Sequence, residues 1–464
     1  MASPAFLSAT ELIEGYRSHA ISPVDAVREA FERIGRLEPN LNALCYLARE
    51  DEALEQARAS ERRWRARQPL GEFDGVPITV KDLILAAGWP TLRGSRTVDP
   101  HQPWLEDAPA VARMREQGAI LLGKTTTPEF GWKGVTDSPL SGVTRNPWNL
   151  EMTPGGSSGG AGAALAAGIG HVSLGTDAGG SVRIPGALCG LVAVKATCGR
   201  VPNYPPSAAG TLGHVGPITR TVTDAAAMLN VIGVPDGRDW LCLPPAGVDY
   251  RSNLGNGVRG MRIAFSPNLG YAKVEPEVAG LVSRAVATFS ELGAHVEEVE
   301  RPFEDPTDVF RVHFFAGIGH AVSGLTDAQR ALLDPGLSAV LERASRVTLG
   351  DYMRAVDRRG ALGRTMRAFH QKYDLLVTPT LAVAAFPVGR IAPEGYGHEW
   401  VDWTPFTYPF NLTGQPACTV PCGLTAAGLP VGIQFVGAMY EDATVLRAAS
   451  AYENARPFRA HPDF

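Results

Sequence analysis

Cysteine is scarce in this chain. Six cysteines occur among 464 residues, and no two of them form a CxxC pair. This excludes the disulfide framework of small secreted proteins and indicates reduced, buried thiols. Cys418 and Cys422 have a spacing that weak metal ligands can use, but no histidine is patterned near them. The sequence therefore predicts no metal site, and we expect no cofactor.

Long hydrophobic runs are also missing. A membrane helix needs about 18–20 consecutive apolar residues, and the nearest approach is the Gly- and Ala-rich stretch 161–170. The first residues, MASPAFLSATELIEG, have no basic start and reach Glu11 before any apolar run has the length found in a signal peptide. We therefore expect a cytoplasmic protein with no membrane partner.

An excess of positive charge is absent as well. The chain carries 43 basic and 48 acidic residues, a formal charge of −5. Attraction to nucleic acid or to an anionic membrane requires the opposite sign. The arginine-rich stretch 49–67 interleaves acids with its arginines, which is typical of a solvated helix. A small molecule is therefore the expected partner, and nucleic acid is not.

Short apolar runs alternate with helical patterns along the chain. One unit is a complete βαβ crossover, with the strand RIAF, a helix from Glu277 to Leu292 that ends at Gly293, and the strand AHVEEVE. Capping signals at Ser8 and Ser22 open two packing helices near the N-terminus. These patterns predict an α/β fold, with a mixed, mostly parallel central sheet covered by helices on both faces. The expected strands are 76–80, 119–122, 172–174, 191–194, 262–265, 375–377 and 431–436.

Glycine is concentrated in one segment. Ten of the 26 residues from Gly155 to Gly180 are glycines, in the runs GGSSGGAGAALAAG and GTDAGGS. Such density marks backbone that approaches another group closely or adopts positive φ. The first run holds Ser157 and Ser158, and Ser181 ends the second. N–H groups of a Gly-rich turn beside a hydroxyl nucleophile form an oxyanion hole, although two tight turns around a small-residue helix would produce the same pattern.

A serine nucleophile requires a base, and none of the ten histidines lies inside either of these two runs. Lys81, within GVPITVKDLIL, is the better candidate. Its apolar neighbours penalise the ammonium form, so a lysine with an ordinary pKa of about 10.4 can become neutral and accept a proton. The alternative is a lysine that ends a strand and pairs with Asp82.

Two segments satisfy the pattern of a known motif, but the residues around them do not favour the structure that the motif requires. GAILLGKT, residues 118–125, satisfies the P-loop pattern, but its centre is typical of a strand rather than of a phosphate-binding loop. GGSSG satisfies the nucleophile-elbow pattern of α/β-hydrolases, which requires a strand directly before the serine. Pro147 and Pro154 lie in the preceding segment, and proline is unsuited to a central strand. We expect neither motif to carry function.

Several segments taken together resemble the amidase signature family. The resemblance extends from Leu12 to Ala455 and is weakest between 235 and 370. It implies a single domain over 1–464, with an N-terminal helical region at about 5–68 and a signature core at about 70–235. The matching segments are PITVKD, TRNPWN, TPGGSSGGAGAALAAG, GTDAGGSVRIPGALCGLVAVKAT, DLLVTPT, NLTGQPACTVPCG and GLPVGIQFVG.

The resemblance implies a Ser-cisSer-Lys triad. Ser181 would be the nucleophile, Ser157 the bridging serine on a cis peptide after Gly156, and Lys81 the base. The two serines lie 24 positions apart, which is the interval usual in the family. The family's reaction is hydrolysis of an amide-type bond through an acyl-enzyme.

Further positions match family residues around this triad. The implied oxyanion hole consists of the backbone N–H groups of Ala178, Gly179, Gly180 and Ser181. The residues that match supporting positions of the two loops are Ser158, Asp177 and Arg183.

The resemblance leaves the substrate open among amides, aryl amides and carbamates, because urethanases and aryl acylamidases both occur in the family. Gly131 and Trp132 are expected to line the acyl pocket, with aromatic walls from the segment 401–411. Such a pocket suits a small hydrophobic or aryl substrate. A homodimer is compatible with the resemblance.

The glutamine-dependent tRNA amidotransferase, through its A subunit, offers the alternative within the family. That function needs polar groups for an amino acid and two partner subunits. Asp402 is the only acidic residue in the segment where the amidotransferase carries a recognition carboxylate, and it lies two positions out of step.

Overall fold

The structure is a computed structural model that describes residues 4–463. One sheet of eleven strands runs through the molecule, and a two-stranded sheet formed by β4 (Asp137–Ser138) and β5 (Gly142–Val143) lies beside it. The eleven strands are β1 (Leu44–Leu47), β2 (Pro77–Lys81), β3 (Ile120–Thr125), β6 (Val172–Asp177), β7 (Val192–Lys195), β8 (His214–Thr219), β9 (Arg262–Phe265), β10 (His295–Glu298), β11 (Leu375–Pro379), β12 (Ala417–Leu424) and β13 (Pro430–Gly437).

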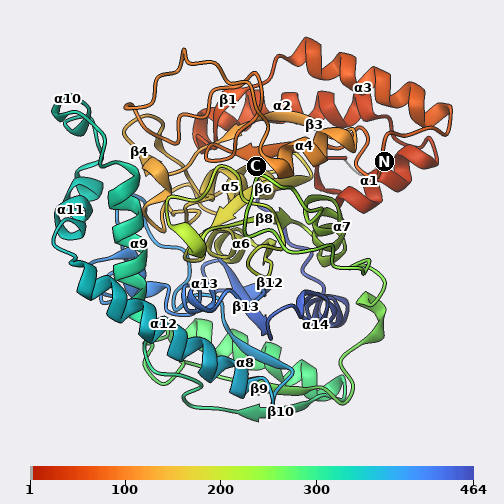
Figure 1. Cartoon of the computed structure of the whole chain (residues 1–464). Helices are drawn as coiled ribbons and strands as arrows, with labels where there is room; N and C mark the ends of the chain where they lie inside the picture. Colours follow the sequence, from red (N-terminus) through yellow and green to blue (C-terminus); the bar gives the residue numbers. More distant parts are fainter. Residues whose placement is uncertain (1–3, 464) are drawn as a thin grey trace.

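Helices surround this sheet (Figure 1). They are α1 (Ala9–Arg17), α2 (Pro23–Leu41), α3 (Glu50–Arg65), α4 (Pro109–Glu116), α5 (Gly159–Ala166), α6 (Arg183–Cys189), α7 (Val222–Ile232), α8 (Pro276–Glu291), α9 (Thr307–Ala321), α10 (Asp327–Arg330), α11 (Pro335–Ala344), α12 (Leu349–Phe369), α13 (Pro409–Thr413) and α14 (Asp442–Ala455). Among residues 4–463, no helix has the length and apolar character needed to cross a membrane.

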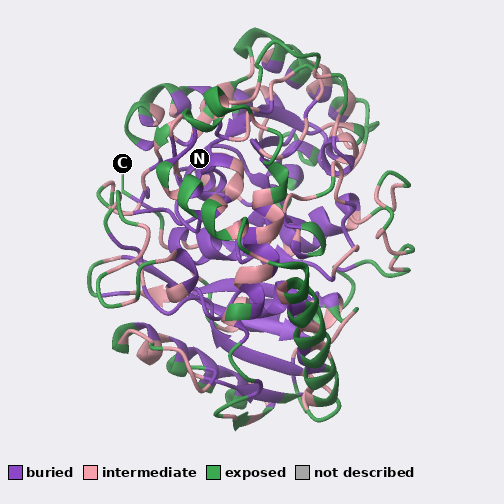
Figure 2. Cartoon of the chain, turned by 60° about the vertical axis from the view of Figure 1, so that its left-hand side comes forward, coloured by how far each residue is buried: buried purple, intermediate pink, exposed green. Residues whose placement is uncertain are grey.

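The large sheet is mixed, in the order β1-β3-β2-β6-β8-β7-β12-β13-β11-β9-β10. Its parallel pairs form two groups, β3-β2-β6 near one edge and β11-β9-β10 at the other. The strands between them pair antiparallel. Every residue of β2, β3, β7, β11 and β13 is buried, so both faces of the sheet are covered. Figure 2 shows these buried strands in purple beneath helices whose outer faces are green. The predicted α/β fold is confirmed.

All eight expected strands are present, the strand AHVEEVE of the βαβ unit included, and the sequence pattern missed the three others of the large sheet. β1 is short and alternates exposed and half-buried residues. β8 reads HVGPIT, in which Gly216 and Pro217 do not favour a strand. β12 contains Pro421 and Gly423, and its register shifts between these two residues. Tertiary packing overrides these weak local signals.

The local helix predictions are also confirmed. Ser8 and Glu11 form a reciprocal capping box, in which Glu11 N donates to Ser8 Oγ over 3.1 Å and Ser8 N donates to Glu11 Oε2 over 2.8 Å. Ser22 Oγ accepts from Val24 N. β9, α8 and β10 form the expected crossover with parallel strands. The segment that mimics a P-loop is the buried strand β3.

Two neighbouring strands position the site. β2 and β6 are parallel, with Val80 opposite Leu174. Their carboxyl ends, Lys81 and Asp177, therefore lie at the same edge of the sheet. The two Gly-rich turns follow at this edge, one before α5 and one before α6. Crevices at the carboxyl ends of parallel strands are the usual place for ligands in such sheets.

Candidate active site

Lys81 is the centre of a cluster of hydroxyl groups. Its side chain is fully buried at the end of β2. The amine nitrogen lies 2.7 Å from Ser157 Oγ, 3.0 Å from Ser158 Oγ and 2.8 Å from Thr176 Oγ1. Within residues 4–463 it forms no ion pair, and Asp82 instead lies 3.7 Å from Lys124 Nζ. The alternative pairing of Lys81 with Asp82 is therefore absent.

This surrounding lowers the pKa of Lys81 well below its ordinary value. Burial is the main cause, since it disfavours the ammonium form, and the negative charge of Asp177 only partly opposes it. Three neutral hydroxyl groups solvate an amine without supplying a counter-charge. Lys81 is therefore suited to accept a proton.

The first Gly-rich turn brings Ser157 to this lysine. The Gly156–Ser157 peptide bond is cis, as the family resemblance implies. A side chain at Gly156 would lie 2.7 Å from the backbone of Val135, so only glycine fits there. Ser158 N donates to Ser181 O over 3.1 Å, which joins the first turn to the second.

Ser181 stands just before α6 and lines the same pocket as Ser157. Its hydroxyl group forms no hydrogen bond with any residue from 4 to 463, whereas Ser157 is held by Lys81. A hydroxyl group that faces a pocket and has no structural partner is available to a substrate carbonyl.

The second turn supplies backbone donors beside Ser181. A side chain at Gly179 would lie 2.7 Å from the Phe310 ring, and one at Gly180, where φ is 126°, would lie 2.5 Å from Thr407 Oγ1. Gly180 N donates to Asp177 Oδ1 over 2.8 Å, so this N–H group is occupied. The N–H groups that donate to nothing in the described part of the chain are those of Ala178, Gly179 and Ser181. Three of the four expected oxyanion donors are therefore open.

A buried ion pair holds this turn in place. Arg183 donates to both carboxylate oxygens of Asp177, over 2.9 Å and 3.0 Å, and both side chains are fully buried. Burial alone would raise the pKa of Asp177, but Arg183 and Asn411 outweigh it and hold that pKa well below its usual range. The remaining guanidinium donors reach Thr407 O, Gln434 Oε1 and Asn411 Oδ1. Asp177 and Arg183 thus connect the second turn to Thr407, Asn411 and Gln434, and Ser158 connects it to the first turn.

Replacing Arg183 with methionine is expected to lower the free energy of unfolding by about 3–5 kcal/mol, because it leaves the buried Asp177 carboxylate without its partner. Urea unfolding followed by tryptophan fluorescence measures this loss. Arg358→Met, which removes an exposed arginine of α12, serves as the control. A loss for Arg183→Met as small as that of the control would mean that the ion pair does not hold the turn.

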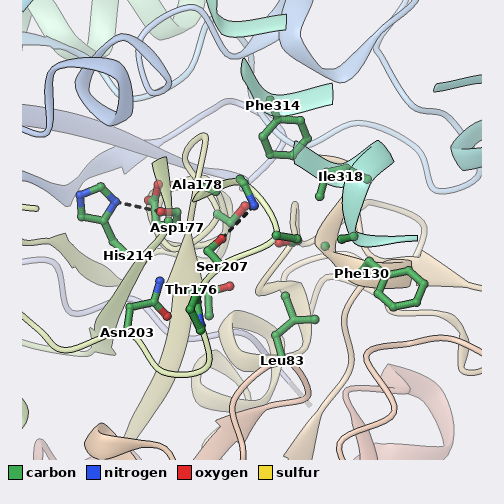
Figure 3. Close-up of a pocket in the computed structure, with 18 of the residues that line it drawn as sticks. Leu83, Phe130, Thr176, Asp177, Ala178, Asn203, Ser207, His214, Phe314 and Ile318 are labelled. Carbon is green, nitrogen blue, oxygen red and sulfur yellow. Dashed lines mark hydrogen bonds between the residues drawn. The ribbon is translucent and has the colours of Figure 1, made fainter. Parts of the chain in front are cut away.

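The walls of the pocket beside the serines combine polar groups with large apolar side chains (Figure 3). Leu83, Phe130, Phe314 and Ile318 contribute the large apolar side chains. Phe314 and Ile318 come from α9, opposite Leu83 in Figure 3. Gly131, with φ of 72°, also lines the pocket, and a side chain there would lie 3.2 Å from Ser157 Oγ. These walls suit an apolar or aromatic group.

Other expected lining residues lie elsewhere. Trp132 is buried in the hydrophobic core, with its ring against Gly336, and is not among the residues of 4–463 that line this pocket. The aromatic side chains of 401–411 also pack in that core. The aromatic walls come instead from Phe130 and Phe314. Phe314 lies in the region where the resemblance is weakest, so sequence offered no signal for it.

Asp402 is also separate from the serines. It accepts from Arg311 Nη2 over 2.8 Å and from the backbone N–H groups of His398 and Glu399. It lines a different surface cavity, together with Tyr271 and Lys273. Its carboxylate therefore does not face the pocket that Ser181 lines.

Known proteins are similar to this chain over almost its whole length. Residues 25–446 match the family described as Amidase. The chain is 40% identical over 463 residues to an acylamidase from Rhodococcus erythropolis, covering 98% of this chain and 96% of that protein. It is 36% identical to the A subunit of glutamyl-tRNA(Gln) amidotransferase from Moorella thermoacetica, covering 99% and 98%. The crystal structure of a bacterial aryl acylamidase of the amidase signature enzymes superposes with a TM-score of 0.91 at 34% identity, covering 98% of this chain and 97% of that one.

Proposed function

Because the chain belongs to the amidase signature family, and is thus a hydrolase of carbon–nitrogen bonds other than peptide bonds, we propose that it cleaves amide-type bonds of small hydrophobic substrates through an acyl-enzyme on Ser181. The observation that carries this proposal is the position of the buried Lys81 amine, which lies 2.7 Å from Ser157 Oγ. Ser157 and Ser181 line the same pocket.

The proton transfers begin with neutral Lys81. Ser181 Oγ attacks the substrate carbonyl carbon and passes its proton to Ser157 Oγ, while the Ser157 proton moves to Lys81 Nζ. The proton then returns through Ser157 to the leaving nitrogen, and the carbon–nitrogen bond breaks. A water molecule enters by the same relay and hydrolyses the ester on Ser181, which restores the free enzyme.

The negative charge that develops on the carbonyl oxygen requires fixed donors. The open N–H groups of Ala178, Gly179 and Ser181 meet this need, and the Asp177–Arg183 pair keeps the turn rigid. Gly180 contributes by its positive φ and by its hydrogen bond to Asp177, rather than by its N–H group.

The pocket walls favour an aryl or hydrophobic group. Phe130, Phe314 and Ile318 offer apolar surface, and the relatives named above include an acylamidase and an aryl acylamidase. A carbamate differs from an amide only by the oxygen beside the carbonyl, so the same nucleophile and donors serve a urethane. Aryl acylamidase and urethanase activities are therefore both proposed.

The amidotransferase function is the alternative, favoured by the 36% identity to a protein of that kind. The position of Asp402 argues against it, because its carboxylate is held by Arg311 outside the pocket. Asp177, the one carboxylate that lines the pocket among residues 4–463, is paired with Arg183. No described acidic group is therefore left to hold an amino acid's ammonium.

A substrate panel tests the proposal. The purified chain alone is expected to hydrolyse p-nitroacetanilide and a phenyl carbamate of aniline faster than it hydrolyses glutamine, because the pocket offers apolar surface and no ammonium site. Release of nitroaniline or aniline and of ammonia measures the three rates. The amidotransferase function would instead be supported if the chain hydrolysed glutamine but neither of the other two substrates. It would also be supported if the chain were active only together with two further proteins and a charged tRNA.

A further inference from the structure

Arg93 is a charged residue on the wall of the proposed active site. It lines the same pocket as Ser157 and Ser181. Its side chain is half-buried, and its guanidinium group forms no hydrogen bond or ion pair with any residue between 4 and 463. Burial lowers the pKa of Arg93, an effect that the nearby Asp82 carboxylate opposes. An arginine nevertheless keeps its charge in a protein.

Asp82 does not neutralise this charge, because its carboxylate has other partners. It accepts from Leu92 N over 3.2 Å and from Gly94 N over 3.3 Å, and it lies 3.7 Å from Lys124 Nζ. Lys124 is buried, with a pKa lowered to about 8 by burial and, among smaller effects, by Arg93 itself. The Asp82 carboxylate thus pairs with Lys124 and holds the turn that carries Arg93, and it forms no ion pair with Arg93 itself.

The backbone around Arg93 points to a role for its side chain. Arg93 has φ of 58° and Phe130 has φ of 51°, a left-handed region that non-glycine residues seldom adopt. The two residues are joined by a hydrogen bond of 2.8 Å from Phe130 N to Arg93 O, and both line the pocket. Unfavourable backbone conformations gather where side chains must be aimed at a ligand.

The other ionisable groups around the pocket carry no free charge. Asp177 is paired with Arg183. Burial lowers the pKa of His214 to about 3, so that its ring is neutral. Lys81 is not among the residues that line the pocket in the described part of the chain. Among the pocket's lining residues in the described part of the chain, Arg93 therefore holds the one unpaired charge.

We propose that Arg93 is a specificity-determining residue that binds a carboxylate on the substrate, in the proposed reaction at Ser181. The planar guanidinium fork matches the two oxygens of a carboxylate. Since the described residues leave the pocket no free acidic group for an ammonium, the preferred substrate is a monoanionic amide with an apolar body rather than a zwitterionic amino acid.

Two matched substrate pairs test this inference. Glutaranilic acid is compared with 5-methylhexananilide, in which an isopropyl group replaces the carboxylate on the acyl side. 4-Acetamidobenzoate is compared with 4-isopropylacetanilide, in which the same replacement is made on the leaving amine. In one of the two pairs, the wild-type enzyme is expected to have a kcat/KM about 10- to 100-fold higher for the charged member. The responding pair identifies the side of the substrate that faces Arg93.

Arg93→Gln is expected to lower the ratio of kcat/KM for the charged member to kcat/KM for the neutral member about 10- to 100-fold. Arg93→Lys is expected to keep part of this preference. Glutamine is also long, polar and unbranched at Cβ, so the substitution places a similar residue in the left-handed backbone conformation of position 93. Arg96→Gln is the matched control, because Arg96 is exposed on the same loop and does not line the pocket. It is expected to leave the ratio unchanged.

The results separate this inference from the function on which it rests. If the wild-type enzyme hydrolyses the neutral anilides but shows no preference for either charged member, the role of Arg93 is overturned while the hydrolase function stands. The same holds if Arg93→Gln folds and leaves the ratio unchanged, or if Arg96→Gln lowers it equally. If none of the four amides is hydrolysed, the proposed function is overturned and the role of Arg93 with it.

Discussion

Replacement of Ser181 by alanine is expected to lower kcat/KM for p-nitroacetanilide at least about 10⁴-fold, because a covalent nucleophile has no substitute in the pocket. The melting temperature is expected to stay nearly unchanged, since Ser181 Oγ forms no hydrogen bond within residues 4–463. Initial rates and a thermal unfolding curve measure the two effects. Loss of a hydrogen-bonded packing serine would instead lower stability.

Covalent labelling supplies the second readout for Ser181. A serine-trapping phosphonate is expected to attach to Ser181 in the wild-type chain and to leave Ser181→Ala unlabelled, as measured by mass spectrometry of peptides. Ser252→Ala, which alters an exposed serine, is the control and is expected to keep both activity and labelling. A label on any other serine, or an unfolded Ser181→Ala, would contradict the assignment of the nucleophile.

Replacement of Lys81 by methionine is expected to lower kcat/KM about 10²- to 10⁴-fold, the usual contribution of a general base. Methionine preserves the length and apolar stem of the side chain but removes the amine that contacts Ser157, Ser158 and Thr176. Lys372→Met, at an exposed position, is the control and is expected to retain full activity. Equal activities of the two variants would mean that Lys81 has no part in proton transfer.

The pH dependence of the wild-type enzyme follows from the same lysine. Only neutral Lys81 accepts a proton, so kcat/KM is expected to rise with pH through the pKa of Lys81 and then to level off. Because burial lowers this pKa well below 10.5, the plateau begins below the pH at which an ordinary lysine loses its proton. His214 does not produce this limb, since its pKa is lowered to about 3. A rate that stays flat from weakly acidic to alkaline pH would argue against a lysine base.

Lys81 makes the free energy of unfolding rise with pH, whereas a salt-bridged lysine, whose pKa is raised, makes it fall with pH. Between the lowered pKa of Lys81 in the folded chain and its ordinary pKa in the unfolded chain, the unfolded chain binds a proton at Lys81 that the folded chain lacks, so lowering the pH in this range favours unfolding. The free energy of unfolding of the wild-type chain is therefore expected to rise with pH more steeply than that of Lys81→Met. This slope, obtained from the same unfolding curves, reports on Lys81 independently of turnover.

Several features of the fold followed from short-range physics. The βαβ unit of β9, α8 and β10 has strand and helix periodicities that differ along the chain, and glycine marks the end of its helix. The caps at Ser8 and Ser22 rest on contacts within three residues. β8 and β12 were missed because their Gly and Pro residues oppose the strand state that packing between neighbouring strands imposes.

Some residues of the candidate site could likewise be predicted from the sequence, and others could not. Ser157 and Ser181 are recognisable in the sequence because they stand in Gly-rich runs, and Lys81 because its neighbours are apolar. The resemblance to the amidase signature family implies that the three form a triad. Thr176 stands in the second Gly-rich run, but nothing in that run indicates a contact with Lys81, and Phe314 stands in no motif. Thr176 reaches Lys81 only because β2 and β6 are adjacent, and Phe314 reaches the pocket only because α9 packs above it.

The amino-acid sequence by itself determined the fold class, because local periodicity depends on neighbours close in the chain. The family and the three residues of the proposed triad came from the resemblance of its motifs to the amidase signature family, and these motifs are likewise continuous segments of the chain. Only the tertiary structure decided which donors of the turn are open, which residues form the pocket walls, and that the Arg93 side chain has no hydrogen-bond or ion-pair partner among residues 4–463. The contacts responsible join distant segments, as when Arg183 reaches Gln434, 251 positions away. Such contacts leave no periodic signal, since they arise from packing of the finished sheet and helices rather than from the preference of any single segment.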